Sequence, residues 1–180
     1  MTSKGTTMKI ALSLLAGAAL AVAAASSAQA ADLLQPANDI YNSPLFNFDG
    51  MYAGATAGMA SYGGGAYGSV GVVVGSNFAV TDGIIVGGEF QGDVYFNGGF
   101  AAYDALALGR VGGFVSDNVM IYGDLGAGLV DTTPVYAFGG GAEMGISGNL
   151  GVRGELQGLG TIGSSPSAGR ATVGLIWHMN

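Results

Sequence analysis

The chain has 180 residues, of which 35 are glycine and none is cysteine, and only 9% are charged. The absence of cysteine excludes a disulfide framework, thiolate metal sites and cysteine nucleophiles. Five basic residues against twelve acidic ones give a net charge of −7, which argues against a nucleic-acid partner because phosphates are bound through Lys and Arg.

Residues 1–30 have the layout of a secretory signal peptide. Lys4 and Lys9 form a positive start, residues 10–25 are apolar, and Ala28-Gln29-Ala30 is a small-x-small cleavage site. A membrane-anchoring helix is the alternative, but the apolar run is short for a span and the cleavage site follows it directly. We therefore predict a signal peptide that is cleaved after Ala30.

The rest of the chain divides into a short leader and one domain. Residues 31–47 contain Pro36, Pro44 and several Asn; they are expected to form an N-terminal periplasmic segment, with a disordered tail as the alternative. The predicted domain, 48–180, has no apolar run long enough for a transmembrane helix, and its glycine content disfavours long helices. An apolar exported chain without helices fits a closed barrel in lipid, because a barrel satisfies every backbone polar group.

Eight segments alternate between polar and apolar residues, as the strands of a membrane barrel do. In 84–96, for example, Glu89, Gln91 and Asp93 share one face, while Phe90 and Val94 share the other. Successive side chains of a strand point to opposite faces, so we expect the charged face to line the lumen and the apolar face to meet lipid. The predicted strands are 50–61, 68–80, 84–96, 104–114, 119–129, 135–146, 150–159 and 169–179.

The segment 104–114 departs from this alternation, since Leu106 and Leu108 share a face with Arg110. A β-bulge would restore the pattern. The main rival fold is a soluble lipocalin-like barrel, also of eight strands, but it would bury the charges and expose Val, Phe and Trp to water. We therefore predict an all-β, eight-stranded antiparallel up-and-down transmembrane β-barrel.

Two kinds of connection alternate along the chain. Tight turns are predicted at 81–83, 116–118 and 147–149, and longer loops at 63–67, 97–103, 130–134 and 160–168, as for short periplasmic turns and longer outer loops. A turn at 147–149 places Glu143 opposite Arg153, and a turn at 116–118 places Arg110 opposite Asp124. Opposite charges across a strand pair stabilise a sheet by roughly 0.2–1 kcal/mol.

The charged residues of the inner face form the first candidate site, a polar lumen network of Glu89, Asp93, Arg110, Asp124, Glu143, Arg153, Glu155 and Arg170. An ion-paired plug that fixes the strand register is favoured, because an eight-stranded barrel is just wide enough for its own side chains. A narrow porin-like channel for small cations is the alternative, since acids outnumber Arg in this set. The second candidate is an aromatic girdle at the membrane interfaces, made of Tyr95, Phe96, Phe100, Tyr136 and Trp177.

No catalytic site is expected. His178 is the only His, and no G-x-S-x-G or H-E-x-x-H motif accompanies it, so we predict a rim side chain at the periplasmic mouth. Residues 63–68 match G-x-G-x-x-G by letter, but no helix follows and a loop is predicted. We expect no enzyme activity, cofactor or metal. The expected partners are outer-membrane lipid and the barrel insertion machinery, and the oligomeric state is left open.

Several segments resemble one family, the small outer-membrane β-barrel proteins of the opacity-like, twenty-five/thirty-one-kilodalton, porin-like type. Phe48-Asp49-Gly50-Met51-Tyr52 resembles the opening strand of that family, residues 109–114 its fourth, 118–128 its fifth, 139–143 its sixth, 152–156 its seventh and 173–179 its closing strand. The resemblance covers 45–179 and implies an eight-stranded barrel in the bacterial outer membrane. The chain departs from the family at its end, where Met179 replaces the usual aromatic residue that the insertion machinery reads.

Overall fold

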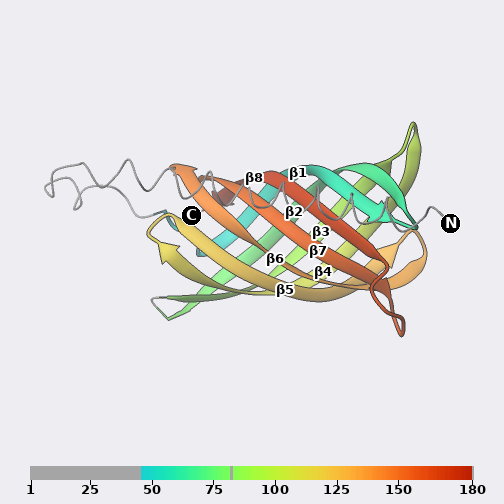
Figure 1. The fold of residues 1–180 in the computed structure, drawn as a ribbon. Helices are drawn as coiled ribbons and strands as arrows, with labels where there is room; N and C mark the ends of the chain where they lie inside the picture. Colours follow the sequence, from blue (N-terminus) through green and yellow to red (C-terminus); the bar gives the residue numbers. More distant parts are fainter. Residues whose placement is uncertain (1–45, 82, 180) are drawn as a thin grey trace, which may run out of the picture. The chain divides into compact units, whose positions relative to one another are not determined.

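The computed structural model describes residues 46–81 and 83–179, and this part of the chain forms eight antiparallel strands that close into a barrel (Figure 1). The strands are β1 (Gly50–Tyr62), β2 (Gly65–Thr81), β3 (Ile84–Phe96), β4 (Phe100–Ser116), β5 (Val119–Val130), β6 (Thr133–Ser147), β7 (Leu150–Thr161) and β8 (Ala168–Met179). None of these residues lies in a helix long and apolar enough to cross a membrane. The predicted signal peptide and residues 31–45 lie outside the described residues.

Each strand pairs with its neighbours in sequence, and β8 pairs with β1 to close the ring. That closing ladder runs from Met51 opposite Met179 to Tyr62 opposite Ala168. A closed ladder leaves no strand with a free row of backbone N–H and C=O groups. The predicted all-β, up-and-down architecture is confirmed.

Most strands are longer than the sequence pattern indicated, and most of the added residues lie at one end of the barrel. We call the end that carries residue 46 and Met179 the terminal end and the opposite one the distal end. The four predicted long loops are wrong in length, since the distal connections are only 63–64, 97–99, 131–132 and 162–167. Gly63 and Gly64 adopt positive φ angles of 57° and 84°, and Asp131 one of 52°. These left-handed residues reverse the chain within two positions, so β2, β5 and β6 extend to the turns.

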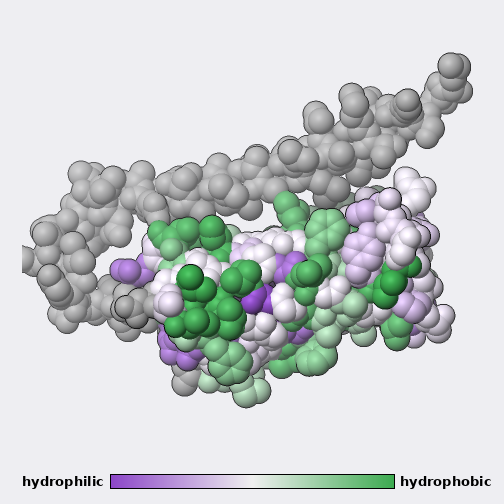
Figure 2. All heavy atoms as spheres, turned by 90° about the horizontal axis from the view of Figure 1, so that it is seen from below, coloured by the Kyte–Doolittle hydropathy of each residue, from purple (hydrophilic) through white to green (hydrophobic). Residues whose placement is uncertain are grey.

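Burial in this barrel is the reverse of that in a soluble protein. Large apolar side chains stand on the outside, with Phe90, Leu125 and Trp177 each more than half exposed, whereas Glu143 and Arg153 are almost fully buried inside. Apolar and neutral residues cover most of the wall drawn in Figure 2. A continuous apolar outer band around a polar interior fits hydrocarbon surroundings, because so large an exposed apolar surface would be unfavourable in water. The strands are therefore transmembrane strands.

Candidate functional site in the barrel lumen

All eight charged residues predicted for the lumen lie on the inner face of the barrel and are buried. A ninth, Asp104 on β4, joins them with 3% of its surface exposed. The sequence carried a signal for it, because Asp104 has the same parity as Arg110 on the same strand. Six buried carboxylates thus face three buried guanidinium groups among the described residues of the lumen.

Arg153 on β7 is the centre of the half of the network nearer the terminal end. Its Nη1 donates to Glu89 Oε2 on β3 at 2.6 Å, and its Nε donates to Glu143 Oε2 on β6 at 3.0 Å. Because β3 and β7 are not adjacent in the ring, the bond to Glu89 crosses the lumen. Arg110 on β4 donates to the same Glu89 oxygen at 3.0 Å. One carboxylate therefore ties together three strands.

Two tyrosines complete this half of the network. Tyr52 donates to Glu89 Oε2 at 2.6 Å and accepts a hydrogen bond from Arg110 Nη1 at 2.6 Å. The Arg110 guanidinium lies 3.8 Å from the ring centre of Tyr122, whose hydroxyl donates to Glu155 at 2.5 Å. The cation–π contact and the charged hydrogen bonds fix both tyrosine rings inside the lumen.

Arg170 on β8 is the centre of the other half. Its Nη1 donates to Asp93 Oδ2 at 2.6 Å and to Asp104 Oδ2 at 2.9 Å, and its Nη2 donates to Gln91 at 2.6 Å and to Gln157. Asp93 and Asp104 stand directly opposite each other in the β3–β4 register. A shared guanidinium between them relieves the repulsion of two adjacent carboxylates.

Amide side chains join the two halves. Gln91 Nε2 donates to Glu89 at 2.7 Å and to Glu155 at 2.9 Å, and Gln157 Nε2 donates to Asp124 at 3.2 Å. The network is therefore continuous from Glu143 to Arg170. Nothing in the described residues groups three or more His, Cys, Asp or Glu side chains in a way that could hold a metal ion.

Glycine provides the room for these large side chains. A Cβ on Gly75 would lie 2.4 Å from the Tyr52 hydroxyl oxygen, and one on Gly71 would lie 2.4 Å from Asp93 Oδ1. A Cβ on Gly141 would meet the Tyr122 hydroxyl at 2.7 Å. These three glycines therefore allow large side chains to approach the inner wall closely.

Both predicted cross-strand registers are confirmed, since Glu143 pairs with Arg153 and Arg110 with Asp124. Only the first pair is also an ion pair. Arg110 instead turns toward Glu89, and Asp124 keeps one carboxylate oxygen without a hydrogen bond. Glu89 lies on the neighbouring strand β3, opposite Leu108 and diagonal to Arg110, so this long side chain bonds a diagonal neighbour on one side and not its direct partner on the other.

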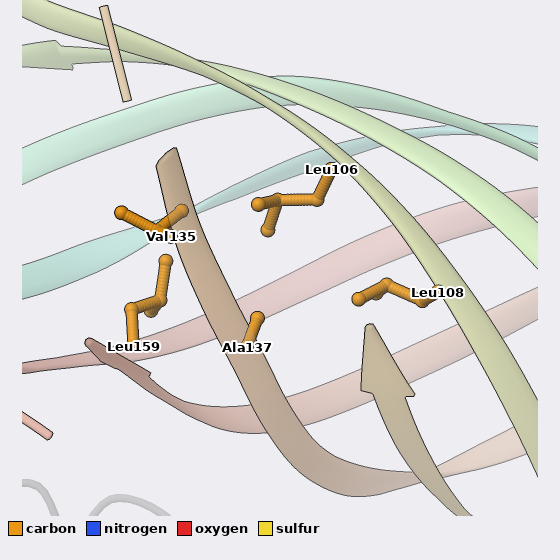
Figure 3. Close-up of a cluster of buried hydrophobic side chains, with 5 residues drawn as sticks. All are labelled: Leu106, Leu108, Val135, Ala137 and Leu159. Atoms are coloured by element: carbon orange, nitrogen blue, oxygen red, sulfur yellow. The ribbon is translucent and has the colours of Figure 1, made fainter. Parts of the chain in front are cut away.

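Leu106 and Leu108 point into the lumen, so the bulge predicted for residues 104–114 is wrong. The β4 register is regular there, and its irregularities lie near Phe96 and Ser116. The two leucines pack with Val135 and Ala137 of β6 and Leu159 of β7, which face one another in Figure 3. An apolar cluster therefore lies beside the polar network on the inner wall, which strict alternation of polar and apolar residues does not anticipate.

His178 is fully buried, so its prediction as a rim side chain is wrong. Its Nε2 lies 2.6 Å from Glu143 Oε1. The rings of Phe46 and Phe48 pack edge-on against the imidazole at 5.1 and 5.7 Å. Phe48 is 1% exposed, and its carbonyl accepts a hydrogen bond from Asn77 at 3.0 Å. Residues 46–48 therefore fill the terminal mouth.

The predicted aromatic girdle divides between the two faces of the wall. Phe96, Phe100 and Trp177 stand outside and are at least 42% exposed. Tyr136 is half-buried, stacks on Phe138 and donates to the Ser164 carbonyl at 2.9 Å. The prediction for Tyr95 is wrong: it points inward, donates to Asp104 Oδ2 at 2.5 Å and accepts from Arg170 at 3.0 Å. Its parity matches Glu89 and not Phe96.

The closed ring and its reversed burial define a small transmembrane β-barrel. No protein-family model matches the sequence, and no curated protein matches it either. Among solved structures, the chain is similar to a de novo designed transmembrane β-barrel, with 18% identity, a TM-score of 0.50, and 73% of this chain and 98% of the other covered. It is also similar to Ail, the attachment invasion locus protein of Yersinia pestis, with 15% identity, a TM-score of 0.50, and coverage of 72% and 98%. At identities this low, the similarity shows a shared fold alone.

Proposed function

We propose that the chain is a bacterial outer-membrane protein that contributes to the structure of the cell envelope and whose polar lumen is closed. The continuous network from Glu143 to Arg170 carries this proposal. Its members are at most 8% exposed and bond across the lumen. Side chains that satisfy one another in this way fill the interior, which agrees with the width expected for eight strands.

Two further features support a closed lumen. Phe46 and Phe48 cover His178 at the terminal mouth. The apolar cluster that includes Leu106 and Leu159 lies toward the distal end and is 2–5% exposed at these two residues. A hydrated ion that followed the axis would have to displace aromatic rings, break charged hydrogen bonds and pass along an apolar cluster on one side.

Export and assembly belong to the same proposal. The sequence of residues 1–30 supports a cleaved signal peptide, and a barrel of this kind would meet the insertion machinery and then outer-membrane lipid. The terminal end would face the periplasm and the distal end the outside, because the longest connection, 162–167, is distal and membrane barrels have short periplasmic turns and longer outer loops. The order of the segments between Phe48 and Met179 supports membership of the opacity-like family.

A narrow cation channel is the second candidate, and the charge balance of the lumen favours it. Six buried carboxylates face three guanidinium groups. Asp124 and Asp93 each keep a buried oxygen without a hydrogen bond. An excess of buried negative charge attracts protons or small cations, and a chain of such sites would conduct.

Conductance of the refolded protein in a planar lipid bilayer tests the two candidates. A closed lumen predicts a silent wild type, with leakage when Arg153→Ala removes the cross-lumen link. Val152→Ala, on the outer face of the same strand, is the matched control and should stay silent. Steady wild-type conductance with a cation preference that falls in Glu143→Gln would contradict the closed lumen and establish the channel.

A further inference from the structure

The distal mouth of the barrel contains a cavity of about 410 Å³, which meets the polar network only at Tyr95. Its floor includes Tyr95, Val135 and Leu159, which are 5–8% exposed. Val135 and Leu159 belong to the apolar cluster shown in Figure 3. The floor of the cavity therefore presents an apolar surface to the distal opening. The polar network lies on the inner wall nearer the terminal end.

Small side chains keep the cavity open. Ala60, Ala102 and Ala168 line its wall, at inward positions of β1, β4 and β8. On β4 and β8 the next inward positions toward the terminal end hold Asp104 and Arg170, which are buried in the network. On β4 and on β8, the inner wall thus changes from a large charged side chain to alanine between two consecutive inward positions.

The charge of the lining limits what can bind. Among the described residues, no Lys, Arg or His lines the cavity, and the one charged residue in its lining, Asp131, is exposed at a turn. Asp131 Oδ1 already accepts a hydrogen bond from the backbone N–H of Tyr103 at 3.2 Å. An anionic ligand would lose its hydration without an opposite charge in the wall, which is costly, and a cationic one would meet only this exposed carboxylate at the edge. The lining is therefore suited to an uncharged molecule.

We propose that this cavity, the distal cup, binds a small uncharged molecule with an apolar ring system that enters from the distal side. The volume lies within the range of about 300–1,000 Å³ found for small-molecule sites. Aromatic rings from Tyr62 and Tyr67 line it and provide surfaces for stacking. Because the floor is packed, the cup would hold its ligand rather than pass it through the barrel. The inference goes beyond the envelope role and does not depend on it.

A protection assay can test the cup, because the chain contains no cysteine. Ala102→Cys places a single thiol in the cup wall, and Ser164→Cys places one in the exposed 162–167 loop as a control. Each variant is refolded into lipid nanodiscs and treated with methyl methanethiosulfonate, with and without 2-naphthol. We expect 2-naphthol to slow modification of Ala102→Cys saturably, by about tenfold at ten times its Kd, and to leave Ser164→Cys unchanged.

Two comparisons make the result specific. Adding Ala168→Leu fills the cup and should abolish protection, whereas adding Ala107→Leu on the outer face of β4 should preserve it. Naphthalene-2-sulfonate has the same ring system with a negative charge and should not protect. Retention of heat-modifiable gel mobility shows that each variant is folded. The proposal is overturned by unsaturable slowing, by equal slowing at Ser164→Cys, by protection that survives Ala168→Leu, or by equal protection from the sulfonate.

Discussion

Arg153→Met is the most informative single change in the lumen. Methionine keeps an unbranched side chain but removes a charge that is 2% exposed and bonded to Glu89 and Glu143 at 2.6 and 3.0 Å. A hydrogen bond between charged groups contributes about 1.5–3 kcal/mol, and loss of one partner of a buried ion pair costs about 3–5 kcal/mol. Arg110 still contacts Glu89, and His178 still contacts Glu143. We therefore expect Arg153→Met to lower the free energy of unfolding by about 3 kcal/mol, the lower limit of that range.

Reversible urea unfolding in phospholipid vesicles measures this loss. The single Trp, Trp177, stands on the outer face and is 56% exposed in the barrel, so its emission should report departure from lipid. A double-mutant cycle with Glu143→Gln isolates the pair, and we expect a coupling free energy of about 1–3 kcal/mol. Val152→Ala is the matched outer-face control. A loss below about 0.5 kcal/mol in Arg153→Met, or strict additivity with Glu143→Gln, would refute the view that this pair holds the lumen together.

Three further changes test other parts of the barrel. Gly145→Leu would drive a side chain into the ring of Phe46, which lies 2.2 Å from where a Cβ would stand; we expect a loss of about 1–3 kcal/mol in urea unfolding. Gly154→Ala, with no atom within 4 Å of its Cβ, is the control, and equal losses would contradict the contact. Leu125→Arg should cost about 2–4 kcal/mol in vesicles, and a cost near zero would mean that this face lies outside the hydrocarbon. Tyr95→Phe removes a hydroxyl that bonds a carboxylate at 2.5 Å and a guanidinium at 3.0 Å; we expect a loss of about 1–3 kcal/mol, and an unchanged urea midpoint would remove Tyr95 from the network.

Strand parity and turn chemistry are sufficient to predict most of the fold from the sequence. The Ser147-Gly148-Asn149 segment contains a turn with Gly148 at φ 48°, and counting outward from it places Glu143 opposite Arg153, as observed. Parity also places Tyr95 with Glu89 on the inner face. Its prediction as a girdle residue rests on its position near a strand end, but strand parity alone places it inside the barrel.

The partners across the lumen could not be predicted in this way. Register along the wall pairs Arg153 with Glu143, but its guanidinium also bonds Glu89 on β3, a strand that is not adjacent to β7. That choice depends on the barrel diameter and on which long side chains meet inside it. Phe46 and Phe48 precede the first strand and belong to no alternating pattern, so periodicity gives no sign that they fill the terminal mouth.

The ladder between β1 and β8 bears on the order in which the protein is made. The ribosome synthesises β1 first and β8 last. β1 therefore cannot pair with β8 until residues Ala168–Met179 have been made. A barrel without β8 would be an open sheet with unpaired edges on β1 and β7, a state prone to pairing with other chains. A stop codon at Ala168 would therefore remove the closure of the whole ring and not merely one strand of it.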